Sequence, residues 1–448
     1  MNKKIVTGIF AGLLITSLST GFAATSDPFA DDAYLPVDRN WKAFENQTKV
    51  KGIYVTGNAI GYNKKFDQLL DLAVTTEINA MIIDVNNDSG HFTYPTQVPM
   101  AVAEGLNNAP LSPKFSVNWD RLKAENVYTV ARVVTFKNSR VAEAYPDLAI
   151  QYADGSVWRD KDGNAWLNAY NPDAWEYPLD IALEAVKMGF DEIQFDYVRF
   201  PDKGKLDLID YKEYEGADRN QAIADFLQYA TDVLSPYGVR VSADIFGQVT
   251  ISRTGEGVGH QLETLADACD VLSPMVYPSH FYMNTLGVKY PDSDPYPIIY
   301  GTMTKAHDRI EVAETSRKKA LMRPWLQDFS APWIKRDYGI NYVSYGPKQV
   351  RAQIEATYDA GYEEWILWSA SNNYTREALL PEGVTDSEGY FPFDPRAPYI
   401  IKKQPAPKPV PEPTPEPETA PETESAPQTE TPEIPENPET ENPETGNE

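Results

Sequence analysis

Strand-like segments that alternate with helical patterns predict a (β/α)8 TIM barrel over residues 50–375. Eight runs rich in β-branched and aromatic residues recur along this region, at residues 52–56, 80–85, 127–135, 192–198, 239–246, 271–277, 321–328 and 364–369. Amphipathic helical patterns separate most of them, at residues 66–76, 174–188, 220–234, 261–268, 306–320 and 347–360. Such alternation is typical of a parallel sheet, and eight units favour a closed barrel. Its working face is then the rim formed by the carboxyl ends of the strands.

The amino-terminal 23 residues have the pattern of a secretory signal peptide. Lys3 and Lys4 precede an apolar run at residues 5–18, and small residues follow it as far as Ala24. This run is short for a bilayer span. We therefore expect cleavage near Ala23, a secreted or cell-envelope location, and no integral membrane segment after cleavage. A retained amino-terminal anchor is the alternative.

The carboxyl-terminal region changes composition sharply. Residues 404–448 are rich in Pro, Glu and Thr and contain twelve Glu but one Lys, so we expect a disordered, extended tail. We expect this tail to associate the protein with the cell envelope. Residues 376–403 are predicted to pack on the barrel as an extension, and residues 24–49 to lead into it. The chain carries a net charge of −26, which argues against nucleic acid and anionic membranes as partners.

The fourth predicted strand, at residues 192–198, has polar groups on alternate positions. With a period of two, Glu192, Gln194 and Asp196 share one face, while Ile193 and Phe195 share the other. Burying a row of polar groups costs free energy unless each group is paired or faces a working cavity. This face is therefore the first candidate for chemistry.

Carboxylates and aromatic residues gather at the predicted carboxyl ends of the strands. They are Asp84, Asn86, Asp196, Asp244, Tyr277, Trp325, Asp328 and Trp368. Aromatic rings stack on sugar faces, and two carboxyl groups can carry out glycoside hydrolysis, so the combination favours carbohydrate chemistry. The alternative for any one of these aspartates is that it caps the helix that follows the strand.

Other chemistries find little support. The four histidines do not have the paired spacing of a zinc hydrolase, and neither a Gly-x-Ser-x-Gly elbow nor a phosphate-binding Gly-Lys loop occurs. We therefore expect no metal and no cofactor. Cys269 is the single cysteine, so it cannot form an internal disulfide, and we interpret it as a small buried hydrophobic residue.

Six segments resemble the bacterial "putative glycosyl hydrolase domain" family of predicted TIM barrels. They are GIYVTG at 52–57, IDVNNDSG at 83–90, VWRD at 157–160, FDEIQFDYVRFP at 190–201, LSPMVYPSH at 272–280 and RPWLQDF at 323–329. The resemblance covers residues 50–372. It implies a barrel of glycosidase ancestry but supplies no substrate.

The sequence departs from better-known glycosidase patterns. No Glu follows Asp196 as in chitinase-like barrels, and the seventh strand offers Gln327 and Asp328 where a catalytic Glu is common. We therefore assign Asp196 as nucleophile and Asp244 as general acid/base, with Asp328 as the rival acid. Neighbouring parallel strands lie about 4.8 Å apart, so the tips of strands four and five can approach the roughly 5–5.5 Å of a retaining pair. Asp328 lies across the barrel and would more naturally leave room for an inverting water.

Further polar residues have weaker assignments. Asp84 and Asn86 are expected to hydrogen-bond a sugar or to orient Asp196, and a role in the turn after their strand is the alternative. Arg199 could steady a carboxylate, or it could form an ordinary surface ion pair.

Tyr277 and Trp368 are the best predicted stacking platforms, with Trp325 and His280 as weaker candidates and core packing as the alternative for each. The sequence therefore predicts a secreted glycoside hydrolase that acts on a polysaccharide or oligosaccharide, with a retaining mechanism favoured. The alternative is a catalytically inactive carbohydrate-binding barrel of the cell envelope.

Overall fold

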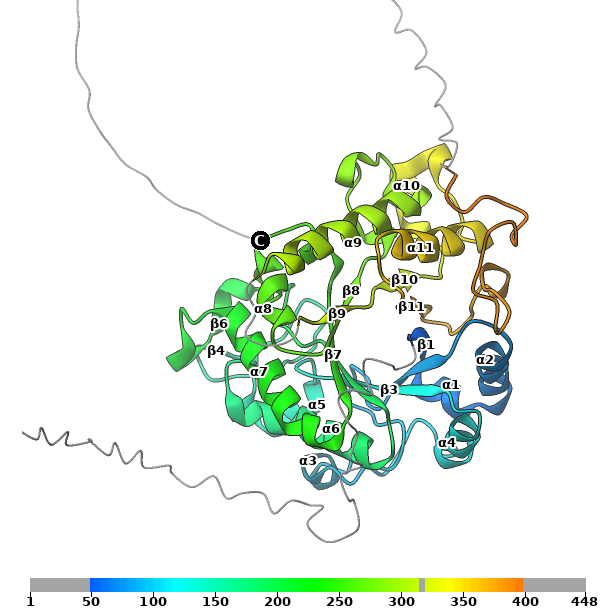
Figure 1. The fold of residues 1–448 in the computed structure, drawn as a ribbon. Coiled ribbons are helices and arrows are strands. Elements are labelled where there is room, and N and C mark those ends of the chain that lie inside the picture. The colour runs from blue at the N-terminus through cyan, green and yellow to red at the C-terminus, as the bar shows by residue number, and fades with distance from the viewer. Residues whose placement is uncertain (1–48, 314–318, 398–448) are drawn as a thin grey trace, which may run out of the picture. The chain divides into compact units, whose positions relative to one another are not determined.

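The computed structural model describes residues 49–313 and 319–397, and it confirms the predicted barrel (Figure 1). The barrel strands are β1 (Lys51–Val55), β2 (Ala80–Asp84), β3 (Tyr128–Val134), β5 (Glu192–Asp196), β7 (Arg240–Phe246), β8 (Val271–Met275), β9 (Leu321–Met322), β10 (Trp325–Gln327) and β11 (Trp365–Trp368). All neighbouring strands are parallel. The sheet closes where β11 pairs with β1, with Trp365 opposite Lys51.

The seventh barrel strand is divided into two pieces, although the sequence predicted one run at 321–328. Arg323 and Pro324 separate β9 from β10. Proline has no N–H to donate to a strand ladder, which limits regular pairing at this point. β9 pairs only with β8, whereas β10 pairs with β11 and, through Trp325, with β8.

Helices surround the barrel (Figure 1). They are α1 (Gly57–Gly61), α2 (Asn63–Thr75), α3 (Pro99–Ala103), α4 (Phe115–Ala124), α5 (Ser139–Ala144), α6 (Glu176–Lys187), α7 (Arg219–Leu234), α8 (Leu262–Ala266), α9 (Pro295–Glu311), α10 (Lys335–Tyr338) and α11 (Pro347–Asp359). The sequence predicted the helix before strand seven at residues 306–320, and these bounds are wrong. The helix, α9, begins at Pro295, since proline is well suited to a first helical turn. A small antiparallel pair, β4 (Gln151–Tyr152) and β6 (Ile209–Asp210), was not predicted.

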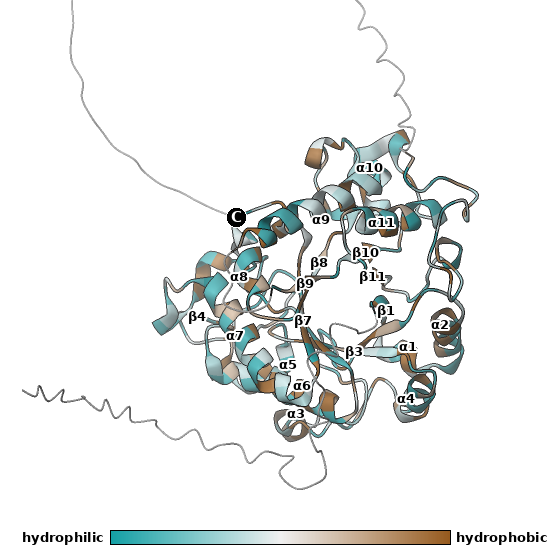
Figure 2. Cartoon of the chain, in the orientation of Figure 1, coloured by the Kyte–Doolittle hydropathy of each residue, from teal (hydrophilic) through white to brown (hydrophobic). Residues whose placement is uncertain are grey.

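Two apolar regions hold the barrel together. The larger one lies between the strands and the helices, and Figure 2 shows that the surrounding helices carry both hydrophilic and hydrophobic residues. The smaller one consists of buried side chains of several strands and of the segment that follows β8: Tyr54, Ile82, Val130, Tyr277, Trp325 and Ile366. It therefore joins residues from opposite sides of the barrel.

A buried ionic network occupies the barrel near the beginnings of its strands. The Arg323 guanidinium contacts both carboxylate oxygens of Glu192, at 2.6 and 3.1 Å, and donates to Glu364 at 2.7 Å. Tyr128 also donates to Glu192, at 3.1 Å. Burial alone would raise the pKa of Glu192, but the charges of Arg323 and Arg240 hold it below its usual value.

This network corrects one expectation about the polar face of the fourth strand. Glu192 does not line a working cavity, because its carboxylate is fully buried and paired with Arg323. Gln194, in the middle of the strand, donates to Ser273 at 3.1 Å and is also fully buried. Of the three polar residues, only Asp196, at the end of the strand, retains partial exposure.

The described part of the carboxyl-terminal extension contacts the barrel layer. The backbone N–H of Glu77 donates to the Leu380 carbonyl at 2.8 Å, and Arg396 forms an ion pair with Asp359. The predicted signal peptide, nearly all of the lead-in segment and the tail at 404–448 lie outside the described residues. Among the residues that are described, every helix is too short or too polar to cross a membrane.

We predict that Arg323→Met lowers the free energy of unfolding by about 3–5 kcal/mol at pH 7, because it leaves Glu192 and Glu364 buried without their main partner. Urea unfolding monitored by circular dichroism measures this change. The matched control is Arg336→Met, whose ion pair with Asp337 is largely exposed, and we expect a change within about 0.5 kcal/mol. Equal effects of the two substitutions would contradict this interpretation of the network.

Candidate active site

Three aspartates and one arginine meet at the carboxyl ends of four adjacent strands. Asp84 ends β2, Asp196 ends β5, and Asp244 lies near the end of β7. Arg132 lies on the intervening strand β3, directly opposite Asp84 in the β2–β3 register. The closed sheet therefore brings these four side chains to one place on the rim.

The Arg132 guanidinium joins the three carboxylates. Its Nη1 lies 2.6 Å from Asp84 Oδ1, its Nε lies 2.9 Å from Asp196 Oδ2, and Nη2 also donates to Asp196. Nε lies 4.0 Å from Asp244 Oδ2. The sequence interpretation did not identify Arg132, although a lone charge in the run Val-Ala-Arg-Val-Val was an available signal, because a buried arginine needs anionic partners.

These contacts limit the separation of Asp196 and Asp244. Both Oδ2 atoms lie close to the same nitrogen, at 2.9 and 4.0 Å, so the two oxygens are no more than about 7 Å apart. That limit lies below the upper end of the carboxyl separations found in glycosidases, about 9.5 Å.

Asp244 is the most enclosed of the three carboxylates. Its side chain is 1% exposed, against 14% for Asp196. Trp325 Nε1 donates to Asp244 Oδ1 at 2.6 Å. Burial, together with the nearby charge of Asp196, raises the pKa of Asp244 well above its usual value. The arrangement therefore favours a protonated Asp244 carboxyl beside Asp196.

Asp84 has two strong partners. Besides the Arg132 contact, its Oδ2 accepts a hydrogen bond from the Tyr54 hydroxyl at 2.6 Å. Burial raises the pKa of Asp84, while the Arg132 charge and the Tyr54 hydrogen bond oppose that rise. Asp84 thus holds Arg132 from the side opposite Asp196, a positioning contact that the sequence did not specify.

The backbone turns sharply directly after Asp196. Tyr197 has a φ of 51°, which lies in the left-handed region that residues with a side chain seldom adopt. The Tyr197 N–H donates to Asp196 Oδ1 at 2.5 Å, and Lys137 lies 4.6 Å from the centre of the Tyr197 ring. The turn therefore supplies a second hydrogen-bond donor to the Asp196 carboxylate.

Asp328 makes its contacts outside this group. Its carboxylate accepts hydrogen bonds from the Thr375 backbone N–H at 2.8 Å and from Thr375 Oγ1 at 2.6 Å. Burial raises the pKa of Asp328 to about 6. Asp328 thus anchors the segment that follows β11, and Arg132 contacts Asp84, Asp196 and Asp244 rather than Asp328.

Asn86 and Arg199 also have specific partners. The Asn86 side chain exchanges two hydrogen bonds with the backbone of Val134, at 2.9 and 3.1 Å, and so braces the end of β3. Arg199 forms an ion pair with Asp202 at 3.0 Å and lies over the rings of neighbouring aromatic residues. Neither side chain contacts Asp196 through a hydrogen bond within the residues that the structure describes.

Two of the predicted stacking residues lie beside the carboxylates. Trp368 packs on Tyr54 with ring centres 6.3 Å apart and an angle of 18° between the planes. Tyr277 contacts Trp368 at 5.6 Å. Because Tyr54 donates a hydrogen bond to Asp84, these rings adjoin the cluster of Arg132 and its three aspartates.

Arg132 provides the positive charge among the three aspartates. Over residues 49–313 and 319–397, no group of three or more His, Cys, Asp or Glu side chains is arranged to hold a metal ion.

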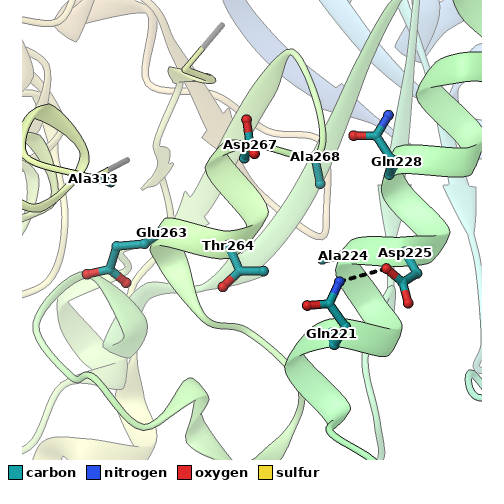
Figure 3. A pocket seen from close by; sticks show the side chains of 9 residues that line it. All are labelled: Gln221, Ala224, Asp225, Gln228, Glu263, Thr264, Asp267, Ala268 and Ala313. Carbon is teal, nitrogen blue, oxygen red and sulfur yellow. Dashed lines mark hydrogen bonds between the residues drawn. The ribbon is translucent and has the colours of Figure 1, made fainter. Parts of the chain in front are cut away.

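A separate pocket of ≈ 470 Å³ lies between α7 and α8 on the helical layer, lined in part by Gln221, Asp225 and Glu263 (Figure 3). None of the candidate site residues lines it.

Comparisons with known proteins agree with this architecture. A family model described as "Putative glycosyl hydrolase domain" matches residues 52–374. A hypothetical protein from Ruminiclostridium thermocellum is 34% identical, with 43% of this chain and 96% of that protein covered and a TM-score of 0.39. The PgaB (BpsB) glycoside hydrolase domain from Bordetella bronchiseptica is 14% identical, with 74% and 99% covered and a TM-score of 0.52, and so shares the fold. No curated protein matches the chain.

We predict that Arg132→Met destabilises the protein by about 3–5 kcal/mol at pH 7, because it leaves up to three poorly exposed carboxylates without their cation. The loss should shrink as the pH falls. The pKa values of Asp84 and Asp244 are already raised in the fold and would rise further, so protonation stabilises the variant relative to the parent. Urea unfolding of both proteins at pH 7 and pH 5 measures the difference.

The control for this experiment is Arg121→Met, which removes an exposed ion pair with Asp67 and should cost no more than about 1 kcal/mol at either pH. A destabilisation by Arg132→Met that is equal at both pH values would show that the aspartate charges are not its cause.

Proposed function

Because the chain belongs to the family described as "Putative glycosyl hydrolase domain", we propose that it cleaves a polysaccharide or oligosaccharide by a retaining mechanism with two carboxylates. One observation carries the mechanism: Asp196 and Asp244 approach the same nitrogen of Arg132, which limits their oxygens to about 7 Å apart. That limit admits the roughly 5–5.5 Å at which one carboxylate can attack the anomeric carbon directly.

Asp196 is the nucleophile in this proposal. Of the three carboxylates bound to or near Arg132, its side chain is the most exposed, so it is the one that a sugar can reach. The Arg132 and Tyr197 N–H groups fix the orientation of its oxygens. Pre-oriented donors of this kind reduce the reorganisation needed during reaction.

Asp244 is the general acid and base. Burial and the charge of Asp196 raise the pKa of Asp244 well above its usual value, which favours the protonated state that an acid catalyst requires. Trp325 donates to Oδ1, so the proton is carried on Oδ2, the oxygen that lies 4.0 Å from Arg132 Nε. Asp84 and Tyr54 act as positioning residues through Arg132.

The reaction then proceeds in two balanced steps. An Asp196 oxygen forms a bond to the anomeric carbon while the glycosidic C–O bond breaks, and Asp244 transfers its proton to the departing oxygen. In the second step Asp244 takes a proton from water, and the water oxygen displaces Asp196 from the anomeric carbon. Both carboxyl groups return to their starting states, and two inversions give net retention.

The location of the reaction is part of the proposal. The signal-peptide pattern of the first 23 residues supports action outside the cytoplasm, at the cell envelope or beyond it. The Pro- and Glu-rich residues 404–448 are then a spacer that links the enzyme to the envelope. Microscopy of the full chain fused to a fluorescent protein, with and without residues 404–448, tests both statements.

The enclosure of Asp244 favours a second candidate function, a carbohydrate-binding barrel without turnover. A side chain that is 1% exposed has little direct access for substrate. A reducing-end assay against a panel of envelope and extracellular polysaccharides separates the two candidates. Turnover by the natural protein that disappears in Asp196→Asn supports the hydrolase, and binding by both proteins without turnover supports the binding barrel.

We predict that Asp196→Ala lowers kcat on an aryl glycoside by about 10⁴-fold or more, because no nucleophile remains. Added azide should restore part of the activity and give the glycosyl azide of inverted configuration. Product analysis by NMR identifies the anomer. Asp244→Ala should instead keep turnover of substrates whose leaving groups need no protonation, and azide should then give the retained product.

The rival acid is tested by Asp328→Asn, which replaces one of the two carboxylate oxygens that accept hydrogen bonds from Thr375. We expect this variant to keep the leaving-group dependence of the parent protein. If Asp328→Asn rather than Asp244→Ala loses activity selectively on substrates with poor leaving groups, Asp328 is the acid and the pairing with Asp244 is wrong.

We predict that Trp325→Phe moves the alkaline limb of the kcat/KM profile to higher pH. The Trp325 hydrogen bond stabilises the ionised form of Asp244 and lowers its pKa, so its removal raises that pKa further. An acid catalyst loses activity as the pH rises through its pKa, so a higher pKa extends activity upward. An alkaline limb that stays in place or moves down would contradict the assignment of Asp244.

A further inference from the structure

A continuous set of aromatic rings leads from the charged group to the protein surface. We call it the aromatic row, and it consists of Tyr54, Trp368, Tyr277, Phe329, His280 and Trp333. At its inner end, Tyr54 donates to Asp84. At its outer end, Trp333 lies in a short 3-10 helix, Pro332–Ile334, that follows β10.

Successive rings of the row are in contact. Trp368 lies 6.3 Å from Tyr54 and 5.2 Å from Phe329, measured between ring centres. Phe329 and Trp333 lie 6.1 Å apart with an angle of 24° between their planes, so the two rings are stacked. His280, in the segment that follows β8, contacts Trp333 with ring centres 6.4 Å apart. The row therefore has no break between the carboxylates and Trp333.

The exposure of the rings changes along the row. Tyr54 and Tyr277 are buried, Phe329 and Trp368 are partly buried, and Trp333 is 59% exposed. Leaving an indole in water forgoes the free energy of burying it, about 25 cal/mol per Å² of apolar surface. One face of Trp333 packs on Phe329, and most of the remaining surface is open to a ligand.

The chemistry of the row suits an uncharged ligand. Its members are aromatic rings without a fixed charge: desolvation by the packed rings, with the charge of Lys203 nearby, lowers the pKa of His280 and favours its neutral imidazole. Neutral rings bind the C–H faces of sugars, as they bind other flat or weakly polar groups, through dispersion and burial of apolar surface.

We propose that the rings of the aromatic row that are not buried, Trp368, Phe329, His280 and Trp333, form a binding track for a neutral polysaccharide, with Trp333 as its outermost platform and the buried Tyr54 and Tyr277 as support beneath it. The proposal rests on the proposed function and adds that the preferred substrate is a polymer that extends from Asp196 to Trp333, rather than a single glycoside. Sugar units distant from the cleaved bond then contribute binding energy through rings that do not touch the reacting atoms.

The test compares Trp333→Ala with the parent protein. Because Trp333 is exposed, we expect the variant to fold normally and to keep its melting temperature within about 2 °C. We expect kcat/KM to fall about tenfold on a polysaccharide, the loss of one stacking platform, and to stay unchanged on an aryl monoglycoside that occupies only the catalytic position. Equal effects on both substrates, or no effect on either, would overturn the proposal.

The matched control is Tyr300→Ala. Tyr300 is also an exposed aromatic residue stacked on a neighbour, Tyr296, with ring centres 6.2 Å apart, but it lies on the outer helix α9. We expect this substitution to leave both substrates unaffected. A loss on the polymer equal to that of Trp333→Ala would show a general effect of surface aromatic residues and would contradict the track.

A binding measurement separates this proposal from the proposed function. Affinity electrophoresis of Asp196→Asn, with and without Trp333→Ala, uses gels that contain soluble starch, hydroxyethyl cellulose or glycol chitin. Retardation that depends on Trp333 supports the track even if the parent protein turns over no substrate, an outcome that would refute only the hydrolase. Turnover of aryl glycosides with no retardation by any of the three polymers would overturn the track and leave the hydrolase standing.

Discussion

One guanidinium lies among three carboxylates at the carboxyl ends of the barrel strands. The side chains there are arranged around this excess of negative charge. Arg132 contacts Asp84 and Asp196 directly and lies at the limit of an ion pair with Asp244. A single positive charge cannot compensate three poorly solvated anions, so proton binding must supply the rest. The raised pKa values of Asp84 and Asp244 express this requirement. The proposed role of Asp244 as the acid rests on the same charge balance.

The buried ionic network near the beginnings of the strands has a different ratio of positive to negative charges. Arg323 and Arg240 lie beside Glu192 and Glu364, so positive and negative charges are matched in number. Here the attraction of the arginine charges outweighs the effect of burial, so the pKa of Glu192 is lowered rather than raised. Replacing such buried pairs by apolar groups is often neutral or stabilising, but ion pairs between strands that are not neighbours also oppose a slip in strand register. We interpret the network as a device that specifies register.

The sequence was sufficient for the barrel, because periodicity of apolar residues is a local signal that survives without tertiary information. It also placed Asp196 and Asp244 on adjacent strands. It did not find Arg132, whose importance lies in contacts with residues 48 and 64 positions away. Nor did it show that Asp328 makes its contacts apart from the other three aspartates, because its partner Thr375 follows the last strand. These features depend on side-chain partners that are distant in the chain, which pattern and spacing do not specify.

Closure of the sheet between its first and last strands has a consequence for biosynthesis. Lys51 pairs with Trp365, and the Thr56 hydroxyl donates to Asn372, 316 residues later. During translation the edge of β1 therefore stays without its partner until nearly the whole barrel has left the ribosome. Such long-range pairing slows folding and exposes strand edges that invite aggregation. The unpaired edge of β1 is therefore a point at which the nascent chain can aggregate until the final strand arrives.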